Sequence, residues 1–158
     1  MPERKCPICK AVLAARRLPE IAGQEGPLGV KVHDMPVLEC PSGHRQFAHP
    51  DFPLQLLDHL VEQDAARLPA STAKGMLFKQ HHCSSCGEKL IDSANEPHTF
   101  HVDVTLPDLS PFDIELTLPV HRCRHCGHEQ LHSLKDVRGR TPAALAHAFK
   151  GAAIAAPA

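Results

Sequence analysis

Apolar and polar residues alternate most clearly in two stretches of the second half of the chain, residues 100–106 and 112–118. Alternation with a period of two is typical of a β-strand that buries one face. Between these stretches, residues 107–111 carry prolines, an aspartate and a serine, which are typical of a turn. The pattern therefore predicts a β-hairpin whose second strand leads directly to Cys123.

The first half of the chain shows a weaker version of the same pattern. Residues 29–33 and 36–39 alternate less distinctly, and the second of these stretches leads to Cys40. The glycine-rich segment at residues 22–29 is predicted to be a loop. A second, less regular hairpin is therefore expected in this half.

Two helices are predicted outside the hairpins. Residues 53–68 show the spacing of an amphipathic helix that ends before Pro69. Its apolar stripe comprises Leu54, Leu57, Leu60, Val61, Ala65 and Leu68. Such a stripe is expected to face the core, and a partner-binding or dimer face is the alternative. Thr141 and Pro142 form a start signal and predict a second helix over residues 142–153.

The cysteines fall into two copies of one pattern, in which a Cys-x-x-Cys pair is followed at a distance by a second cysteine-containing turn. A Cys-x-x-Cys turn directs two sulfurs at one ion, and two such turns supply the four tetrahedral ligands of a structural Zn²⁺. The predicted ligands are Cys6, Cys9, Cys40 and His44 at site one, and Cys83, Cys86, Cys123 and Cys126 at site two. The sequence therefore predicts two Zn²⁺ ions per chain.

Site one has only three cysteines, so its fourth ligand is predicted from spacing. His44 lies four residues after the third cysteine, within the reach of a short turn, and His49 and His33 are the alternatives. Glycine follows both pairs of site two, where it suits a tight turn, whereas Lys10 stands at the position that matches Gly87. A slightly strained turn is therefore expected at site one.

Several histidines lie close to site two in the sequence. They are His81, His82, His121, His125 and His128. Solvated loop positions are the expected role for such residues, and a second, weaker metal site is the alternative.

The composition bears on how this chain is stabilised. It has 158 residues with no Trp or Tyr, six Phe and fifteen Pro, so two small units would each have a thin apolar core. The N-terminal residues lack the apolar stretch of a signal peptide, no apolar run is long enough to span a membrane, and the number of cysteines is odd. These features favour metal–thiolate bonds in the reducing cytoplasm over disulfides.

The repeated pattern predicts a small, metal-stabilised α+β fold made of tandem zinc ribbons, with an intervening amphipathic helix and a C-terminal helix. The first ribbon, with its helix, is expected to cover residues 1–69. A linker at residues 70–75 leads to the second ribbon at residues 76–140. Residues 141–158 are expected to form the C-terminal helix and tail. A divergent duplication is the simplest origin of such an arrangement.

Three features of the first half occur together: Cys6-Pro-Ile-Cys9, the run Met35-Pro-Val-Leu-Glu-Cys40, and a Gly43-His44 turn followed by a helix from Pro53. In this combination the first half resembles the YgiT-type zinc finger, the N-terminal domain of MqsA-like antitoxins. That family usually closes its site with a second Cys-x-x-Cys pair, and full antitoxins carry a helix-turn-helix where this chain has a second ribbon. The resemblance implies structural zinc and contact with a protein such as a toxin, and does not imply autorepression of an operon. The second half resembles zinc ribbons in general.

A protein-interaction or adaptor module, antitoxin-like or regulatory, is the predicted function, because both sites are closed and no catalytic set is evident. Nucleic-acid binding is the alternative, although the formal net charge of −1 lacks the basic excess typical of such proteins. A metalloenzyme would need an open ligand position, which site one would offer only if His44 does not bind. A rubredoxin-like iron centre is the redox alternative for the four-cysteine set.

Overall fold

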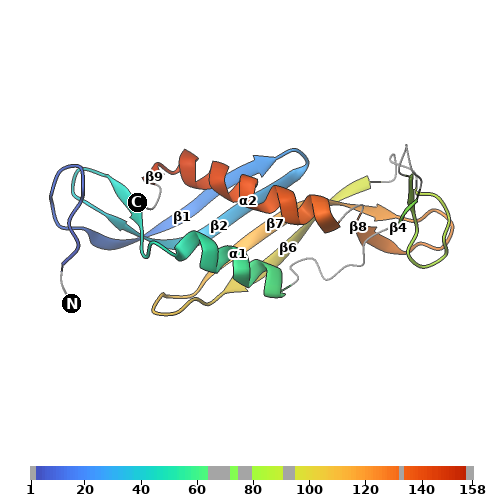
Figure 1. The fold of residues 1–158 in the computed structure, drawn as a ribbon, viewed down its shortest axis with the longest axis horizontal. Coiled ribbons are helices and arrows are strands. Elements are labelled where there is room, and N and C mark those ends of the chain that lie inside the picture. Colours follow the sequence, from blue (N-terminus) through green and yellow to red (C-terminus); the bar gives the residue numbers. More distant parts are fainter. Residues whose placement is uncertain (1–2, 64–71, 75–79, 91–94, 132–133, 156–158) are drawn as a thin grey trace.

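The computed structural model describes residues 3–63, 72–74, 80–90, 95–131 and 134–155 (Figure 1). Over these residues it is a small α+β fold that consists mostly of sheet, with two helices. The elements in chain order are β1 (Ala14–Glu25), β2 (Leu28–Glu39), β3 (Arg45–Phe47), α1 (Phe52–Gln63), β4 (Thr72–Lys74), β5 (Gln80–His82), β6 (Asn95–Val104), β7 (Phe112–Arg122), β8 (Glu129–Leu131), α2 (Leu134–Gly151) and β9 (Ile154–Ala155).

One sheet joins the two predicted ribbons. The hairpin β1–β2 comes from the first half and the hairpin β6–β7 from the second, and antiparallel pairing of β2 with β7 connects them. In this central pairing Gly29 lies opposite Thr117, and His33 lies opposite Asp113. The predicted ribbons therefore follow one another along the chain, but their hairpins are parts of a single sheet.

The order of elements is the same in both halves. Each half begins with a cysteine turn and a hairpin, and continues with a second cysteine turn, a short strand (β3 or β8) and a helix (α1 or α2). Because β2 and β7 are equivalent strands and pair antiparallel, the halves are related by an approximate two-fold axis through the middle of the sheet. This arrangement supports the interpretation that the sequence contains an internal repeat.

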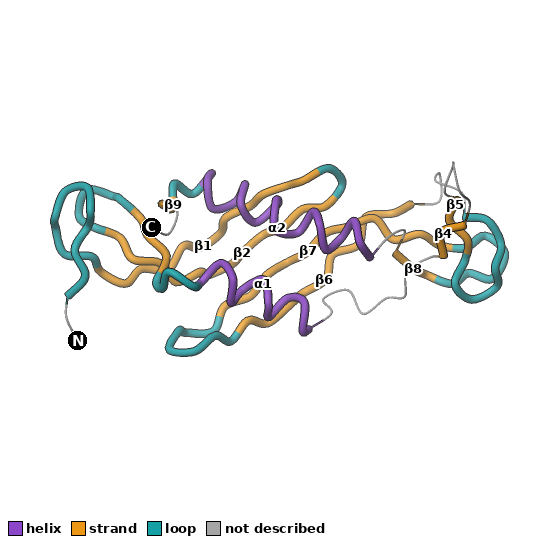
Figure 2. The backbone as a smooth tube through the Cα atoms, in the orientation of Figure 1, coloured by secondary structure: helices purple, strands orange, loops and turns teal. Residues whose placement is uncertain are grey.

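Both helices lie on the same face of the sheet (Figures 1 and 2). The strand residues that point toward them, such as Val30, Val32, Ile114 and Leu116, are buried and form one core with apolar residues of both helices. The opposite face, here called the open face, is lined by partly buried or exposed side chains. It includes Glu20, Lys31, His33, Thr99, His101, Asp113, Glu115 and Thr117.

A kink at Asp34 keeps the apolar side chains of β2 on the helix-covered face. Asp34 has a left-handed backbone (φ 56°), and the register of β1 with β2 omits its pairing with Pro19. Before the kink the buried residues include Val32, and after it they include Met35, so the alternation shifts by one residue. Pro19 has no N–H to contribute to a ladder, which suits it to this irregular position.

The glycine-rich segment at residues 22–29 is not the predicted loop. It forms the end of β1 and the start of β2, and the tight turn between them contains Gly26 with φ 58°. The prediction was wrong because Gly23, which suggests a loop by composition, lies where α2 packs closely on β1. A glycine in a strand often marks such an approach.

The buried face of α1 differs from the predicted stripe. Phe52, Leu56 and Leu60 are buried, and Leu57 packs at the edge of the core, whereas Leu54 is 66% exposed. The ring of Phe52 stacks on Phe47 and Phe112 at centroid distances of 5.5 and 5.9 Å, which sets the helix rotation. The side chain of Val61, and residues Ala65 and Leu68, lie outside what the structure describes.

The C-terminal helix begins earlier than predicted. α2 starts at Leu134, passes through Pro142 and ends at Gly151. Pro142 lacks an N–H, so the helix loses one hydrogen bond there instead of starting there. Within the expected linker, residues 72–74 form β4, which pairs with β5.

Candidate metal centres

Site one consists of the four residues predicted from the sequence. The donor atoms of Cys6, Cys9, Cys40 and His44 all lie within 4.8 Å of one another, so they could hold a metal ion. His44 Nδ1 lies 3.5 Å from the Cys6 sulfur and 3.3 Å from the Cys40 sulfur, and the Cys9 and Cys40 sulfurs are 3.6 Å apart. A tetrahedral zinc site with ordinary bond lengths has sulfur–sulfur edges of about 3.8 Å and sulfur–nitrogen edges of about 3.6 Å. The donor set therefore fits a tetrahedral ion.

Site two has the same geometry with four sulfurs. Cys83, Cys86, Cys123 and Cys126 lie within the same mutual distance, and could likewise hold a metal ion. The Cys83–Cys126 and Cys86–Cys123 sulfur pairs are both separated by 3.6 Å. A disulfide would require about 2.05 Å, and all seven cysteines are free thiols.

Equivalent backbone hydrogen bonds shape the first turn of each site. The N–H of Cys6 donates to Ala11 O (2.8 Å), and the N–H of Cys83 donates to Glu88 O (2.7 Å). Within the turns, the N–H of Lys10 donates to Cys6 O (2.9 Å), and that of Gly87 donates to Cys83 O (3.0 Å). Both halves therefore build their first cysteine turns in the same way.

The second turn of each site is also closed by matching bonds. Cys40 N donates to His44 O and Cys123 N donates to His128 O, each at 3.0 Å. This match makes His44 the counterpart of His128, although the first turn is one residue shorter. In site one the short turn brings the His44 ring to the sulfurs, and in site two Cys126 supplies the fourth donor.

Backbone and side-chain donors favour the thiolate form of one buried cysteine in each site. The N–H of Cys9 is the main cause of a lowered pKa at Cys6, which falls to about 6 despite burial. Burial raises the pKa of Cys83, but hydrogen bonds led by the Cys86 N–H and the Gln130 amide outweigh it and lower the pKa to about 5.

The pKa values of Cys86 and Cys126 in site two are raised instead of lowered. The N–H of Glu88 lowers the pKa of Cys86, but burial and the sulfurs of Cys123 and Cys126 raise it to about 12. Four clustered sulfurs repel additional negative charge, so a bound cation is what would allow all four to be thiolates.

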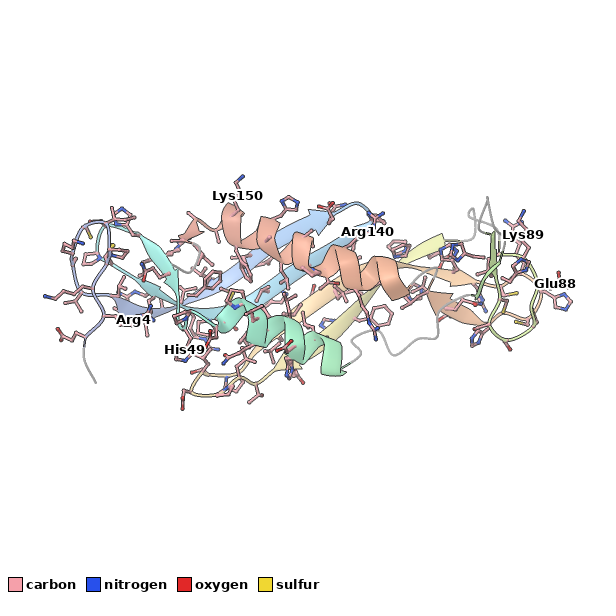
Figure 3. The ribbon with its side chains drawn as sticks, in the orientation of Figure 1. Arg4, His49, Glu88, Lys89, Arg140 and Lys150 are labelled. Atoms are coloured by element: carbon pink, nitrogen blue, oxygen red, sulfur yellow. The ribbon has the colours of Figure 1, made fainter. Side chains whose placement is uncertain are left out.

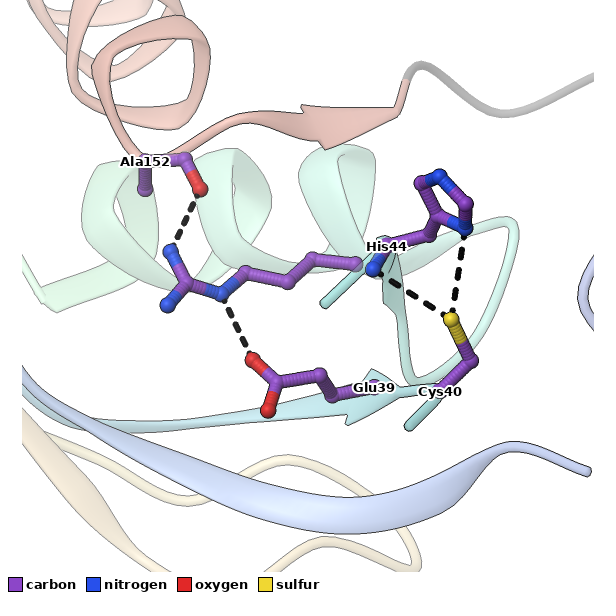
Figure 4. Close-up of polar contacts among 5 residues, drawn as sticks. Glu39, Cys40, His44 and Ala152 are labelled. Carbon is purple, nitrogen blue, oxygen red and sulfur yellow. Dashed lines mark hydrogen bonds and ion pairs between the residues drawn. The ribbon is translucent and has the colours of Figure 1, made fainter. Parts of the chain in front are cut away.

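Site one is connected directly to the C-terminal end of α2 (Figure 4). Arg45, which follows His44, donates to Glu39 Oε2 at 2.9 Å and to Ala152 O at 2.8 Å. The strand β3 that contains Arg45 also pairs in parallel with β9. The second turn of site one therefore contacts the C-terminal end of the second half of the chain.

The two sites lie at opposite ends of the elongated molecule (Figures 1 and 3). In Figure 3, Arg4 marks the end with site one, and Glu88 and Lys89 mark the end with site two. Each site packs on a small apolar cluster of its own, formed around Leu13 in site one and around Leu90 in site two. These clusters are separate from the central core.

The other histidines named as candidate ligands lie elsewhere or have other contacts. His33 is in the middle of the open face, where its Nε2 lies 3.3 Å from Glu115 Oε1. The carbonyl of His49 accepts the N–H of Phe52 at the start of α1. Near site two, His82 Nδ1 contacts Gly87 O at 3.1 Å, and His121 is buried.

Sequence reasoning missed one residue of site two. Gln130 in β8 is fully buried and its amide reaches the Cys83 sulfur at 3.2 Å. The available signal was the internal repeat, because Gln46 occupies the equivalent position two residues after His44.

Lys10 adopts the left-handed backbone that its counterpart Gly87 adopts, with φ values of 63° and 80°. We therefore expect Lys10→Gly to raise the free energy of unfolding by about 0.5–1 kcal/mol, since relief of left-handed strain exceeds the added entropy of the unfolded chain. Gly87→Lys should lower it by a similar amount. Urea unfolding of the metal-loaded variants measures both changes. A loss of stability in Lys10→Gly would contradict the claim that the backbone of Lys10 is strained.

Among the described residues, no helix is long and apolar enough to cross a membrane. Comparison of the chain with protein-family models, with curated proteins and with solved structures gives no match. The function of the chain is therefore inferred from its two metal centres and from the sheet that joins them.

Proposed function

We propose that this protein is a cytoplasmic, zinc-binding double zinc ribbon that acts as a protein-interaction or adaptor module. The observation that carries the zinc assignment is the pair of complete four-donor sets, whose sulfur–sulfur distances of 3.6 Å suit a tetrahedral ion. Free cysteines in both sets suit a reducing compartment.

A structural role for both ions follows from their ligands. Catalytic zinc keeps an open coordination position for water, whereas four protein donors fill a tetrahedron. Both proposed ions also lie at the ends of the sheet, where they stabilise turns with small apolar clusters of their own. We therefore propose that the ions stabilise the fold and that the protein is not an enzyme.

The open face is the proposed docking surface for a partner protein. Side chains from adjacent strands form polar pairs across it, including Lys31 with Glu20 (3.8 Å), His33 with Glu115 (3.3 Å) and the hydroxyls of Thr99 and Thr117 (3.0 Å). Carboxylates on this face oppose the approach of phosphate groups, so it suits a protein better than a nucleic acid. The resemblance of the first half to antitoxin zinc domains, in which the zinc domain contacts a toxin, supports the same proposal.

Metal analysis of purified protein tests the zinc assignment. Two zinc ions per chain and no thiols reactive to a thiol reagent are expected, because all seven cysteines would be ligands. A red protein that contains iron would show instead that site two is a rubredoxin-like iron centre. Chains with no bound metal would refute the proposal.

Site-specific photo-crosslinking in the native host tests the adaptor role. A crosslinking residue at His101, which is 67% exposed on the open face, should capture one defined protein. The same residue at Leu54, exposed on the helix-covered side, is the control and should not capture it. Equal capture at both positions, or capture of nucleic acid alone, would contradict docking at the open face.

His44→Ala tests the fourth ligand of site one. The zinc affinity of site one is expected to fall at least about tenfold, because a four-donor site would keep only three protein ligands. Site two should be unaffected, since it lies at the other end of the molecule. Competition with a chelator measures the affinity. An unchanged affinity would show that His44 is not a ligand and that another histidine supplies the fourth donor atom.

A further inference from the structure

We infer that Gln130 is a positioning residue of site two, whose side-chain amide donates to the Cys83 sulfur, orients it toward the metal position and offsets the charge of the four-sulfur set. This inference deepens the proposed function and rests on zinc binding at site two. It concerns a residue that is not itself a metal ligand.

The amide of Gln130 connects both cysteine turns of the site. Its Nε2 lies 3.2 Å from the Cys83 sulfur and 3.4 Å from His128 O, and its Oε1 accepts the N–H of Ser84 at 2.8 Å. Ser84 belongs to the first turn, and His128 closes the second. With a side chain that is 0% exposed, Gln130 has its polar atoms satisfied by the site itself.

These contacts fix which way the amide points. Ser84 N–H is a donor, so it must face the amide oxygen, and the amide NH₂ must then face the Cys83 sulfur and His128 O. A sulfur that receives an N–H bond is an acceptor, and the thiolate is the stronger acceptor form. The orientation therefore makes the Gln130 amide a hydrogen-bond donor to the Cys83 sulfur.

The two sites differ in the charge that such a donor must offset. Zn²⁺ with four thiolates leaves two negative charges, whereas three thiolates and a neutral imidazole leave one. Outer-sphere hydrogen bonds to ligands stabilise and orient a metal site, and their removal typically lowers metal affinity by about 10–100-fold. Site two, with the larger negative charge, is the site that has the buried amide.

The first repeat supplies a matched control. Gln46 is the counterpart of Gln130, because both lie two residues after the histidine that closes the second turn. Gln46 is only half-buried, and Cys6, the counterpart of Cys83, faces the His44 ring at 3.5 Å. A substitution at Gln46 therefore removes the same side chain from the same strand position without removing a sulfur contact of this kind.

The experiment compares Gln130→Glu, Gln130→Leu and Gln46→Leu with the wild type in the full-length chain. Loading with ¹¹³Cd²⁺ gives one NMR signal per site, and titration with a chelator measures the affinity of each site from its own signal. Both Gln130 variants should lower the affinity of site two by about 10–100-fold and shift its signal. Gln46→Leu should change neither site two nor its signal.

Gln130→Leu and Gln130→Glu together separate positioning from packing. The Glu variant keeps the size of the side chain and an oxygen for Ser84 N–H, but it places a carboxylate oxygen against the Cys83 sulfur. A positioning role predicts that both variants lower the affinity of site two, because both lose the N–H donor. A packing role predicts that Leu is nearly neutral and that only Glu, which buries a charge, lowers the affinity. Amide exchange in the central β2–β7 pairing confirms that the variants remain folded.

The outcomes separate the inference from the proposed function. Equal site-two affinity and signal in the wild type and in either Gln130 variant would overturn the inference while leaving zinc binding intact. Equal losses at both sites in the Gln130 variants would also overturn it, because they would show a general folding defect. A wild-type chain without a site-two signal would overturn both the inference and the proposed function.

Discussion

Replacement of Gly23 by alanine is expected to lower the free energy of unfolding by about 3 kcal/mol or more. A Cβ atom at this position would lie 2.0 Å from the Ala144 carbonyl oxygen and 2.5 Å from the Ala148 backbone nitrogen. Both obstacles are backbone atoms of α2, so no side-chain rotation can relieve the overlap. The helix would have to move away from β1, and the core between them would open.

Gly29→Ala is the matched control for this substitution. Gly29 lies in the same hairpin, opposite Gln24, and the nearest atoms to a Cβ there are 4.0 Å away. The free energy of unfolding of Gly29→Ala should differ from that of the wild type by less than about 1 kcal/mol, because the entropy of the unfolded chain is the main effect. Urea unfolding at constant zinc concentration measures both variants. Equal stability of the Gly23 and Gly29 variants would contradict the close packing of α2 on β1.

Local sequence patterns predicted the two sets of donor residues that the structure brings together, and the hairpin of the second half. The spacing of Cys83 and Cys86, and of Cys123 and Cys126, constrains the chemistry because a tetrahedral ion needs paired sulfurs. The same reasoning chose His44 over His49 and His33, and the structure brings His44 to the three sulfurs of site one. These predictions concern contacts within a turn or between turns that one hairpin connects.

Contacts between the two halves could not be predicted in this way. The pairing of β2 with β7 joins residues at least 80 positions apart, and either strand would also suit a separate ribbon. The rotation of α1 was missed because Phe52, which precedes the predicted stripe, packs on Phe47 and Phe112. The role of Gly23 depends on a helix that follows it by more than 100 residues. Non-local packing of this kind leaves no periodic signal in the sequence.

The shared sheet also changes the expected effect of losing site two. Two independent ribbons would lead us to expect that Cys86→Ser unfolds residues 76–140 and leaves the first ribbon intact. In the structure, however, β6 and β7 contribute Val102, Ile114 and Leu116 to the central core, which also contains residues of β2. Cys83, Leu90 and Cys123 form a separate small cluster around site two. The central core and the small cluster around site two should therefore respond differently to the loss of site two.

We expect Cys86→Ser to release one of two zinc ions and to unfold the end of the molecule around residues 81–90 and 122–130. Structural zinc sites contribute apparent binding energies of about 10–16 kcal/mol, so the small cluster is not expected to stay folded without the ion. Amide exchange should become fast at this end, while β2, the paired part of β7 and site one stay protected. Ser85→Ala, an exposed neighbour in the same turn, should leave exchange and zinc content unchanged. Fast exchange throughout β6 and β7 in Cys86→Ser would show instead that the metal, and not the shared core, holds the second hairpin in place.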